Sequence, residues 1–158
     1  MALRRTVAEL PESVEELALV RFGLVAHRLS AWRFVRDYGQ AVETASATAV
    51  AERAGLLGSE RIANGWGRVG FLQYWASFES LDAWSHRPPH SEWWRKALDR
   101  LRVKADIGVY HETFVVPRRN VESISIDCPP VGLSGFGILS DPVGPKTSAR
   151  DRLGRRTS

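Results

Sequence analysis

The sequence predicts an α+β protein built in the order strand, helix, strand, strand, helix, strand. Apolar and β-branched runs indicate the strands, which fall at residues 17–29, 56–62, 68–75 and 108–116. Helical periodicity fills the two long intervals, residues 30–54 and 77–103. A turn signal, Asn64-Gly65-Trp66-Gly67, joins the middle strands as a hairpin. This order is that of the ferredoxin-like fold, an antiparallel sheet with its helices on one face.

Burial and capping patterns predict the first strand and the first helix. Residues 17–29 are aliphatic with few polar interruptions, which indicates a strand buried on much of both faces. Ser30 is placed to cap the helix that follows. Trp32, Val35 and Tyr38 then recur at three-residue spacing, as the buried side of a helix does.

The second helix is expected in two pieces. Ser77 is its expected N-cap, and Glu79 brings a negative charge to the positive end of the helix. Pro88-Pro89 must break the helix, so a second piece is expected over residues 91–103. The fourth strand follows and is closed by Pro117.

The chain of 158 residues is expected to form one domain over residues 17–139. We expect residues 1–16 to be a loosely held arm and residues 140–158 a disordered basic tail, rich in Pro, Gly, Ser and Arg. Residues 141–158 carry five Lys and Arg against two Asp, which accounts for most of the net charge of +4. The folded part is therefore near neutral, which argues against a nucleic-acid partner.

Cysteine usage and hydropathy limit the compartment. A single cysteine, Cys128, excludes an internal disulfide framework and a multi-cysteine metal site. No apolar run approaches the roughly 20 residues of a membrane helix, and the N-terminal residues lack a signal-peptide pattern. We therefore expect a cytoplasmic protein with no membrane partner.

The predicted sheet leaves one face without a covering layer. Helices would cover one face, and strand residues such as Phe71 and Val116 would meet water on the other. A second copy of the same sheet would cover them. The sequence therefore predicts a homodimer with face-to-face sheets.

Isolated histidines are the first candidates for chemistry. The sequence has no phosphate loop, His-Glu-x-x-His motif or nucleophile elbow, and no metal site is expected. His111 alternates in phase with Val109 and Thr113, which predicts burial. It is either a core histidine bonded to a backbone carbonyl or a general base facing a cleft. Glu112 falls on the other face, where an ion pair with Arg28 or with a partner subunit is expected.

His90 follows the break at Pro88-Pro89 and lies one helical turn before Trp94. It is either an exposed loop histidine or an imidazole that projects into an apolar pocket. In the second case His90 is also a candidate proximal ligand of a non-covalent haem b, with His111 as the distal acid or base. The tryptophans of this stretch, Trp84 among them, fit a core or a dimer contact as well as a cofactor pocket.

Several segments taken together resemble a known family. They are Gly55-Leu56-Leu57-Gly58, Gln73-Tyr74-Trp75-Ala76-Ser77-Phe78-Glu79-Ser80-Leu81 with His90 and Trp94, Gly108-Val109-Tyr110-His111-Glu112-Thr113-Phe114, and Cys128-Pro129-Pro130-Val131-Gly132-Leu133. They resemble the small monooxygenase-like family of the fumagillin-biosynthesis type, within the antibiotic-biosynthesis-monooxygenase group. The resemblance spans roughly residues 19–139. It implies a dimeric α+β barrel with a pocket between each sheet and its helices.

The resemblance also implies chemistry. Enzymes of this group oxygenate polycyclic or polyketide-like molecules of secondary metabolism, some without a cofactor, and relatives of the same fold use or degrade haem. The residues carried over are Tyr74, Trp75, His90, Trp94, His111 and Glu112, with Trp84 where haem-degrading relatives carry a helix tryptophan. Relatives tend to end the first strand with arginine and asparagine, whereas here Arg28 is followed by Leu29-Ser30.

The expected function is a base-assisted, cofactor-free oxidation of a largely apolar small molecule. His111 is the expected base, and His90 or Arg28 would stabilise the oxyanion. The residues expected to hold the substrate are Tyr74, Trp84, Trp94 and Thr113. Two alternatives stay open. One is a haem-dependent enzyme, aldoxime-dehydratase-like or related, with His90 as ligand, and the other is a protein that binds a small molecule without turnover.

Overall fold

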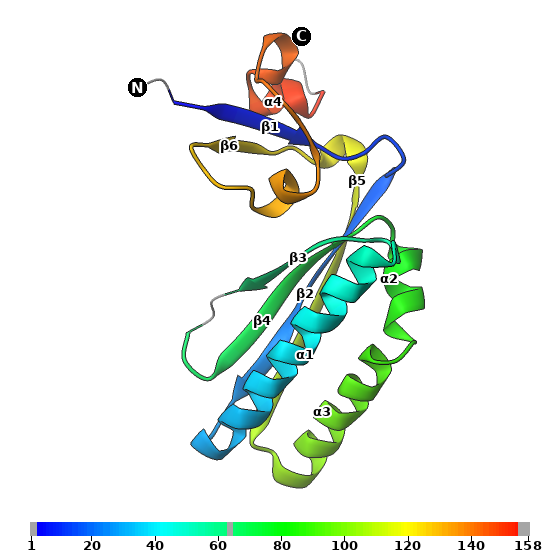
Figure 1. Ribbon diagram of the computed structural model, residues 1–158, viewed down its shortest axis with the longest axis vertical. Coiled ribbons are helices and arrows are strands. Elements are labelled where there is room, and N and C mark those ends of the chain that lie inside the picture. The colour runs from blue at the N-terminus through cyan, green and yellow to red at the C-terminus, as the bar shows by residue number, and fades with distance from the viewer. Residues whose placement is uncertain (1–2, 63–64, 155–158) are drawn as a thin grey trace. The chain divides into compact units, whose positions relative to one another are not determined.

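The computed structural model describes residues 3–62 and 65–154 (Figure 1). Its larger sheet runs in the spatial order β3 (Leu56–Ile62), β4 (Arg68–Trp75), β2 (Glu16–Ala26) and β5 (Ile107–Pro117). β4 pairs antiparallel with both β2 and β3. This is the strand order of the ferredoxin-like fold, so the predicted fold class is confirmed. Asn64 of the predicted turn lies outside the described residues.

Three helices cover one face of this sheet (Figure 1). They are α1 (Trp32–Ala51), α2 (Phe78–Ser85) and α3 (His90–Lys104). Val69, Phe71 and Trp75 of β4 point at the helices and are each at most 1% exposed. The expectation that Phe71 lies on the uncovered face was therefore wrong, because the two-residue period of the strand puts it in phase with Val69 and Trp75.

The helix ends match the sequence signals only in part. Ser77 caps α2, since its Oγ accepts a hydrogen bond from the Ser80 amide at 3.1 Å. Ser30 does not cap α1: it lies in the 3-10 turn η1 (Leu29–Ala31), and the α1 N-cap is Ala31, with no side-chain bond. The predicted break holds, because α2 ends at Ser85 and α3 begins after the cis Pro88-Pro89 bond.

The sheet face turned away from the helices carries an aromatic and ionic cluster. Gly23 pairs opposite Gly70 across β2 and β4. A Cβ on Gly23 would come within 2.6 Å of the Tyr110 hydroxyl, so Tyr110 lies close over the glycine pair. Arg21 stacks on the Tyr110 ring at 5.2 Å and pairs with Glu112 at 2.9 Å. Glu112 thus pairs with Arg21, in place of the expected Arg28.

The terminal segments form a second compact unit, residues 1–17 with 116–158. β1 (Arg5–Glu9) lies between β6 (Ile124–Ile126) and β7 (Ile138–Ser140) in an antiparallel three-stranded sheet. The unit also contains short helical turns: η2 (Arg118–Asn120), η3 (Gly132–Gly135), η4 (Gly144–Lys146) and α4 (Ala149–Arg152).

This unit differs from the arm over residues 1–16 and the disordered tail over residues 140–158 that the sequence suggested. Charged residues of the supposed tail are fixed by partners: Lys146 Nζ lies 2.7 Å from a Glu9 carboxylate oxygen. Arg152 pairs with Glu122 at 2.8 Å and donates to the backbone carbonyls of Lys146 and Thr147. The C-terminal segment is therefore tied to β1 through Lys146 and to Glu122 through Arg152.

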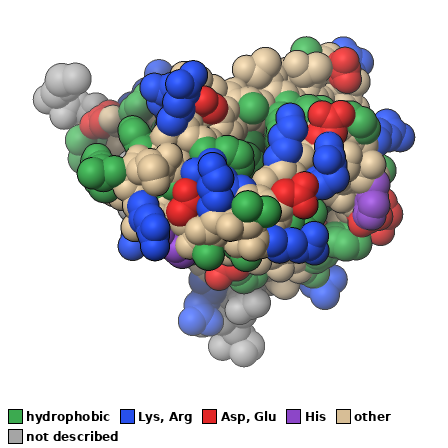
Figure 2. Space-filling model, turned by 90° about the horizontal axis from the view of Figure 1, so that it is seen from below, with side chains coloured by type: hydrophobic (Ala, Val, Ile, Leu, Met, Phe, Trp, Pro, Cys, Tyr) green, Lys and Arg blue, Asp and Glu red, His purple; other side chains and the backbone are tan. Residues whose placement is uncertain are grey.

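Charged side chains of both signs are mixed on the face shown in Figure 2, with no large area of one sign. On this face, the basic side chains do not gather as a nucleic-acid footprint would. Within residues 3–62 and 65–154, helices with the length and apolar character of a membrane span are absent.

Candidate active site

A cavity of about 210 Å³ lies between the larger sheet and the helices α2 and α3. The sheet supplies its floor, with Phe22 from β2, Gln73 from β4, and His111 and Thr113 from β5. The helices supply its wall: Phe78, Leu81, Asp82, Trp84, Ser85 and His90. The cavity thus brings together His90, His111, Trp84 and Thr113, all expected from the sequence as site residues.

The histidine at the start of α3 has a fixed tautomer. His90 Nδ1 lies 2.8 Å from the carbonyl oxygen of Ser85, at the other side of the helix break. A carbonyl only accepts, so Nδ1 carries the hydrogen and Nε2 keeps its lone pair. The imidazole is half-buried and lies 5.0 Å from the Trp84 ring. His90 therefore presents an acceptor nitrogen beside an aromatic wall.

The environment keeps His90 neutral. Burial lowers its pKa from the ordinary histidine value, and the positive charges that His111 and His86 can carry lower it further. The hydrogen bond to Ser85 works in the opposite direction but is the weaker effect. Near pH 7 the ring is consequently unprotonated at Nε2.

His111 is less enclosed than the sequence suggested. His111 is exposed, because β5 is an edge strand. The strand pattern had predicted that it would be buried. The ring contacts Phe22 at 6.3 Å and Trp94 at 6.5 Å, and this partial burial lowers its pKa. Of the residues that the structure describes, none hydrogen-bonds the ring, so the interpretation as a carbonyl-bonded core histidine does not hold.

A buried glutamine at the cavity floor was missed by the sequence analysis. Gln73 is 1% exposed. Trp75 Nε1 donates to Gln73 Oε1 at 3.2 Å, and Gln73 Nε2 donates to Ser46 Oγ at 2.9 Å. An indole N–H only donates, so this contact identifies Oε1 and fixes the orientation of the amide. The sequence does contain a signal for it, because Gln73 has the same strand phase as the buried apolar residues Val69, Phe71 and Trp75.

Three expected site residues do not line the cavity. Arg28 is exposed and lies beyond the end of β2. Tyr74 has the opposite strand phase to Gln73 and lies near Glu60, and burial followed by the charge of Glu60 raises its pKa. Trp94 is 40% exposed, and its ring lies 6.5 Å from the His111 ring.

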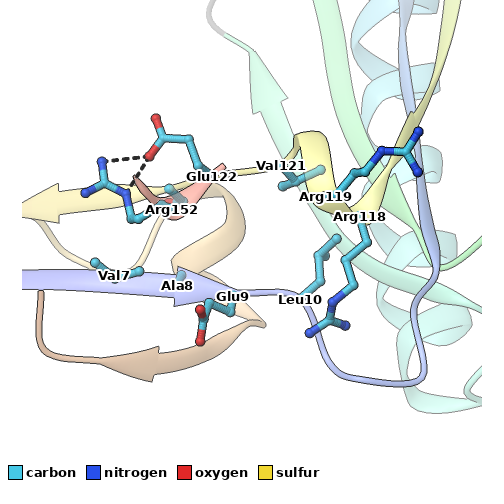
Figure 3. Close-up of a pocket in the computed structure, with 10 residues that line it drawn as sticks. Val7, Ala8, Glu9, Leu10, Arg118, Arg119, Val121, Glu122 and Arg152 are labelled. Carbon is cyan, nitrogen blue, oxygen red and sulfur yellow. Dashed lines mark hydrogen bonds and ion pairs between the residues drawn. The ribbon is translucent and has the colours of Figure 1, made fainter. Parts of the chain in front are cut away.

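The second unit has a cavity of its own, about 250 Å³, lined by Val7, Leu10, Arg118, Glu122 and Arg152 among others (Figure 3). Most of its charged groups bind other parts of the protein and so stabilise the unit. Arg152 and Glu122 pair with each other, and Arg118 donates to the backbone carbonyls of Pro11 and Val14. The cavity with two histidines is the better candidate for chemistry. Across residues 3–62 and 65–154, no three His, Cys, Asp or Glu residues gather as a metal site.

Comparisons with known proteins agree with this fold. The family model described as monooxygenase af470-like matches residues 19–133. A solved aldoxime dehydratase, OxdRE in complex with butyraldoxime, shares 15% identity over 96% of this chain, with a TM-score of 0.63. This chain spans 42% of that protein's length. At this identity the likeness concerns the fold.

Smaller oxygenase-type structures are also similar. SnoaB from Streptomyces nogalater, described as a cofactor-independent oxygenase, is 15% identical over 63% of this chain and 91% of its own, with a TM-score of 0.41. A putative antibiotic biosynthesis monooxygenase from Deinococcus radiodurans is 15% identical over 60% of this chain and 89% of its own, with a TM-score of 0.39. A comparison with curated protein sequences gives no significant match.

Proposed function

The chain belongs to the monooxygenase af470-like family, and from this membership we propose that it oxidises a small, largely apolar and electron-rich molecule with molecular oxygen. The observation that carries the proposal is the fixed imidazole of His90 in an aromatic cavity, with its acceptor nitrogen unprotonated near neutral pH. A base held by a carbonyl on one nitrogen is ready to take a proton on the other.

We assign the base role to His90, whereas the sequence favoured His111. The Ser85 carbonyl fixes the tautomer of His90, and no described residue does the same for His111. His111 faces the same cavity from the sheet, so we assign it a hydrogen bond to the peroxide anion, while His90 returns the proton that it removed. Trp84 and Phe22 line the cavity and would pack against the ring system of the substrate.

The proposed reaction balances with dioxygen as the only oxidant. His90 removes a proton from an acidic C–H carbon of the substrate, and the carbanion gives one electron to O₂. The resulting radical and superoxide combine as a peroxide anion, which takes the proton back from His90. Loss of water from the CH–OOH carbon leaves a ketone, so CH₂ and O₂ become C=O and H₂O.

The cavity volume limits the substrate. Ligand pockets for drug-sized molecules usually hold roughly 300–1,000 Å³, and this cavity is about 210 Å³. A few fused rings are the largest system that it would enclose. We therefore propose substrates of the anthrone type, in which an aromatic ketone acidifies a CH₂ group.

Oxygen uptake with anthrone tests the proposal. Protein treated with a chelator should consume O₂ and form anthraquinone faster than buffer does, because the base is supplied by the chain. Saturable binding of anthrone without added oxygen consumption would instead favour the non-catalytic binding protein. A rate restored only by an added metal or cofactor would contradict the cofactor-free mechanism.

A haem-dependent function is the second candidate, because His90 has the second-sphere bond typical of a metal-bound histidine. The lone pair on Nε2 of His90 would be the donor that holds the haem iron. The cavity does not fit the macrocycle, since about 210 Å³ will not enclose a tetrapyrrole. Titration with hemin should accordingly give no Soret band that depends on His90. A band that is lost in His90→Ala but kept in His111→Ala would replace the cofactor-free proposal.

A homodimer formed through the open face of the larger sheet belongs to the same proposal. This face carries Arg21, Tyr110 and Glu112, together with Phe114, which is 54% exposed. A second copy would cover these residues. This face lies opposite the helices, whereas the cavity lies between the sheet and the helices. A dimer formed through the open face would therefore not block the cavity of either chain.

A further inference from the structure

We propose that Gln73 anchors the carbonyl oxygen of the substrate at the cavity floor. The assignment deepens the proposed function and rests on it. Gln73 is at once a lining residue of the cavity and 1% exposed. A polar group so deeply buried is held by partners, and those partners determine what it can offer to a ligand.

The hydrogen bonds of Gln73 leave a defined donor. Trp75 Nε1 occupies Oε1 from one side, and Ser46 Oγ accepts from Nε2. An amide nitrogen carries two hydrogens, and Ser46 takes only one of them. The second hydrogen has no protein acceptor among the described residues, although the side chain lies at the cavity floor. The part of the floor that β2 supplies is apolar, with Val20 and Phe22.

A ligand with an acceptor oxygen satisfies this hydrogen. A buried donor without an acceptor is costly, so the cavity should favour a ketone over a hydrocarbon of the same shape. The same donor would help the chemistry. When His90 removes the proton, negative charge develops on the ketone oxygen of an anthrone-type substrate, and a pre-oriented N–H stabilises that charge more than the neutral ketone.

Trp75 acts as a positioning residue in this arrangement. Its indole is fully buried and donates to Oε1. Without that donor, the amide could turn and present its oxygen to the cavity, which would repel a ketone. The sequence alternation that buries Trp75 and Gln73 on one face of β4 thus also sets the polarity of the cavity floor.

The test compares two unreactive ligands of similar shape, anthraquinone and anthracene, by quenching of tryptophan fluorescence. Wild-type protein should bind anthraquinone more tightly, by roughly tenfold for one hydrogen bond to a buried donor. Gln73→Leu should abolish the preference. Gln73→Glu, which has nearly the same shape but lacks the N–H, should abolish or reverse it. The ratio of the two affinities is the readout, because a substitution that only disturbed the structure would lower the affinity for both ligands alike.

Ser46→Ala is the matched control, since it removes the partner of the other amide hydrogen and leaves the second donor in place. Its preference for anthraquinone should stay close to that of wild type. Equal affinities in wild type, or a preference that survives in both Gln73 variants, would overturn the anchor. If Gln73→Leu does not fold by circular dichroism, Gln73→Glu decides alone. A clear preference without oxygen uptake on anthrone would refute the proposed function and leave the anchor standing.

Discussion

Replacing His90 by glutamine should lower the rate of oxygen uptake with anthrone by at least about 100-fold, the usual lower bound for the loss of a general base. Glutamine preserves the size and polarity of the side chain but cannot take up a proton. Its amide can still donate to the Ser85 carbonyl, which His90 Nδ1 contacts at 2.8 Å. The helix break should therefore keep its structure, and binding of anthraquinone should change little. Stopped-flow or electrode measurements of O₂ at saturating anthrone would give the rate.

The pH dependence has a definite sign. The base works only when neutral, and burial lowers the pKa of His90 below the ordinary histidine value of about 6.5. Activity should be constant near neutral pH and fall as the pH drops through this lowered pKa. In His90→Gln that acid limb should disappear from the residual rate.

His86→Gln is the matched control, because His86 is exposed, lies four residues before His90 and has its Nδ1 2.8 Å from the Asp82 carbonyl oxygen. It should keep the wild-type rate. His111→Ala should show a smaller loss than His90→Gln, since it removes a hydrogen bond to the peroxide anion and leaves proton transfer by His90 in place. Undiminished uptake in His90→Gln, or a larger loss in His111→Ala, would contradict the assignment of the base.

Local patterns were sufficient for the larger sheet. The predicted strand over residues 56–62 coincides with β3, and the cap at Ser77 and the break at Pro88-Pro89 are where the sequence placed them. Each of these features depends on neighbours within one or two turns of the chain. Such signals can be read directly from residue order.

The second unit could not be predicted in this way. β1 pairs with β6 and β7, strands that lie more than a hundred residues away, and both are only three residues long. Short runs such as Ile124–Ile126 carry little periodicity of their own. The pairs Lys146–Glu9 and Arg152–Glu122 hold the C-terminal segment, but the composition of that segment is typical of disorder.

The site was predicted in part, and strand phase explains the difference. His90, Trp84, His111 and Thr113 were expected, and all line the cavity. Tyr74 was expected on the strength of a motif, although its neighbour Gln73 has the phase that faces the helices. Gln73 was overlooked because polar residues in strands usually face water, and only its two buried partners reveal its place.

Light scattering at micromolar concentration should give a mass of twice the 17.7 kDa of one chain. The physical reason is the larger sheet, whose open face holds Tyr110, the Arg21–Glu112 pair and Phe114. Obligate interfaces of this type bury on the order of 2,000 Å² or more. Phe114→Arg places a charge on this face and should reduce the measured mass to that of one chain.

Val103→Arg provides the matched control for the dimer. Val103 is 80% exposed, more than Phe114, but it lies near the C-terminal end of α3 and not on the sheet. The same charge at that position should leave the mass of the dimer unchanged. A wild-type mass of one chain throughout the micromolar range would refute the sheet-to-sheet dimer. Dissociation in Val103→Arg but not in Phe114→Arg would move the interface from the sheet to the helices.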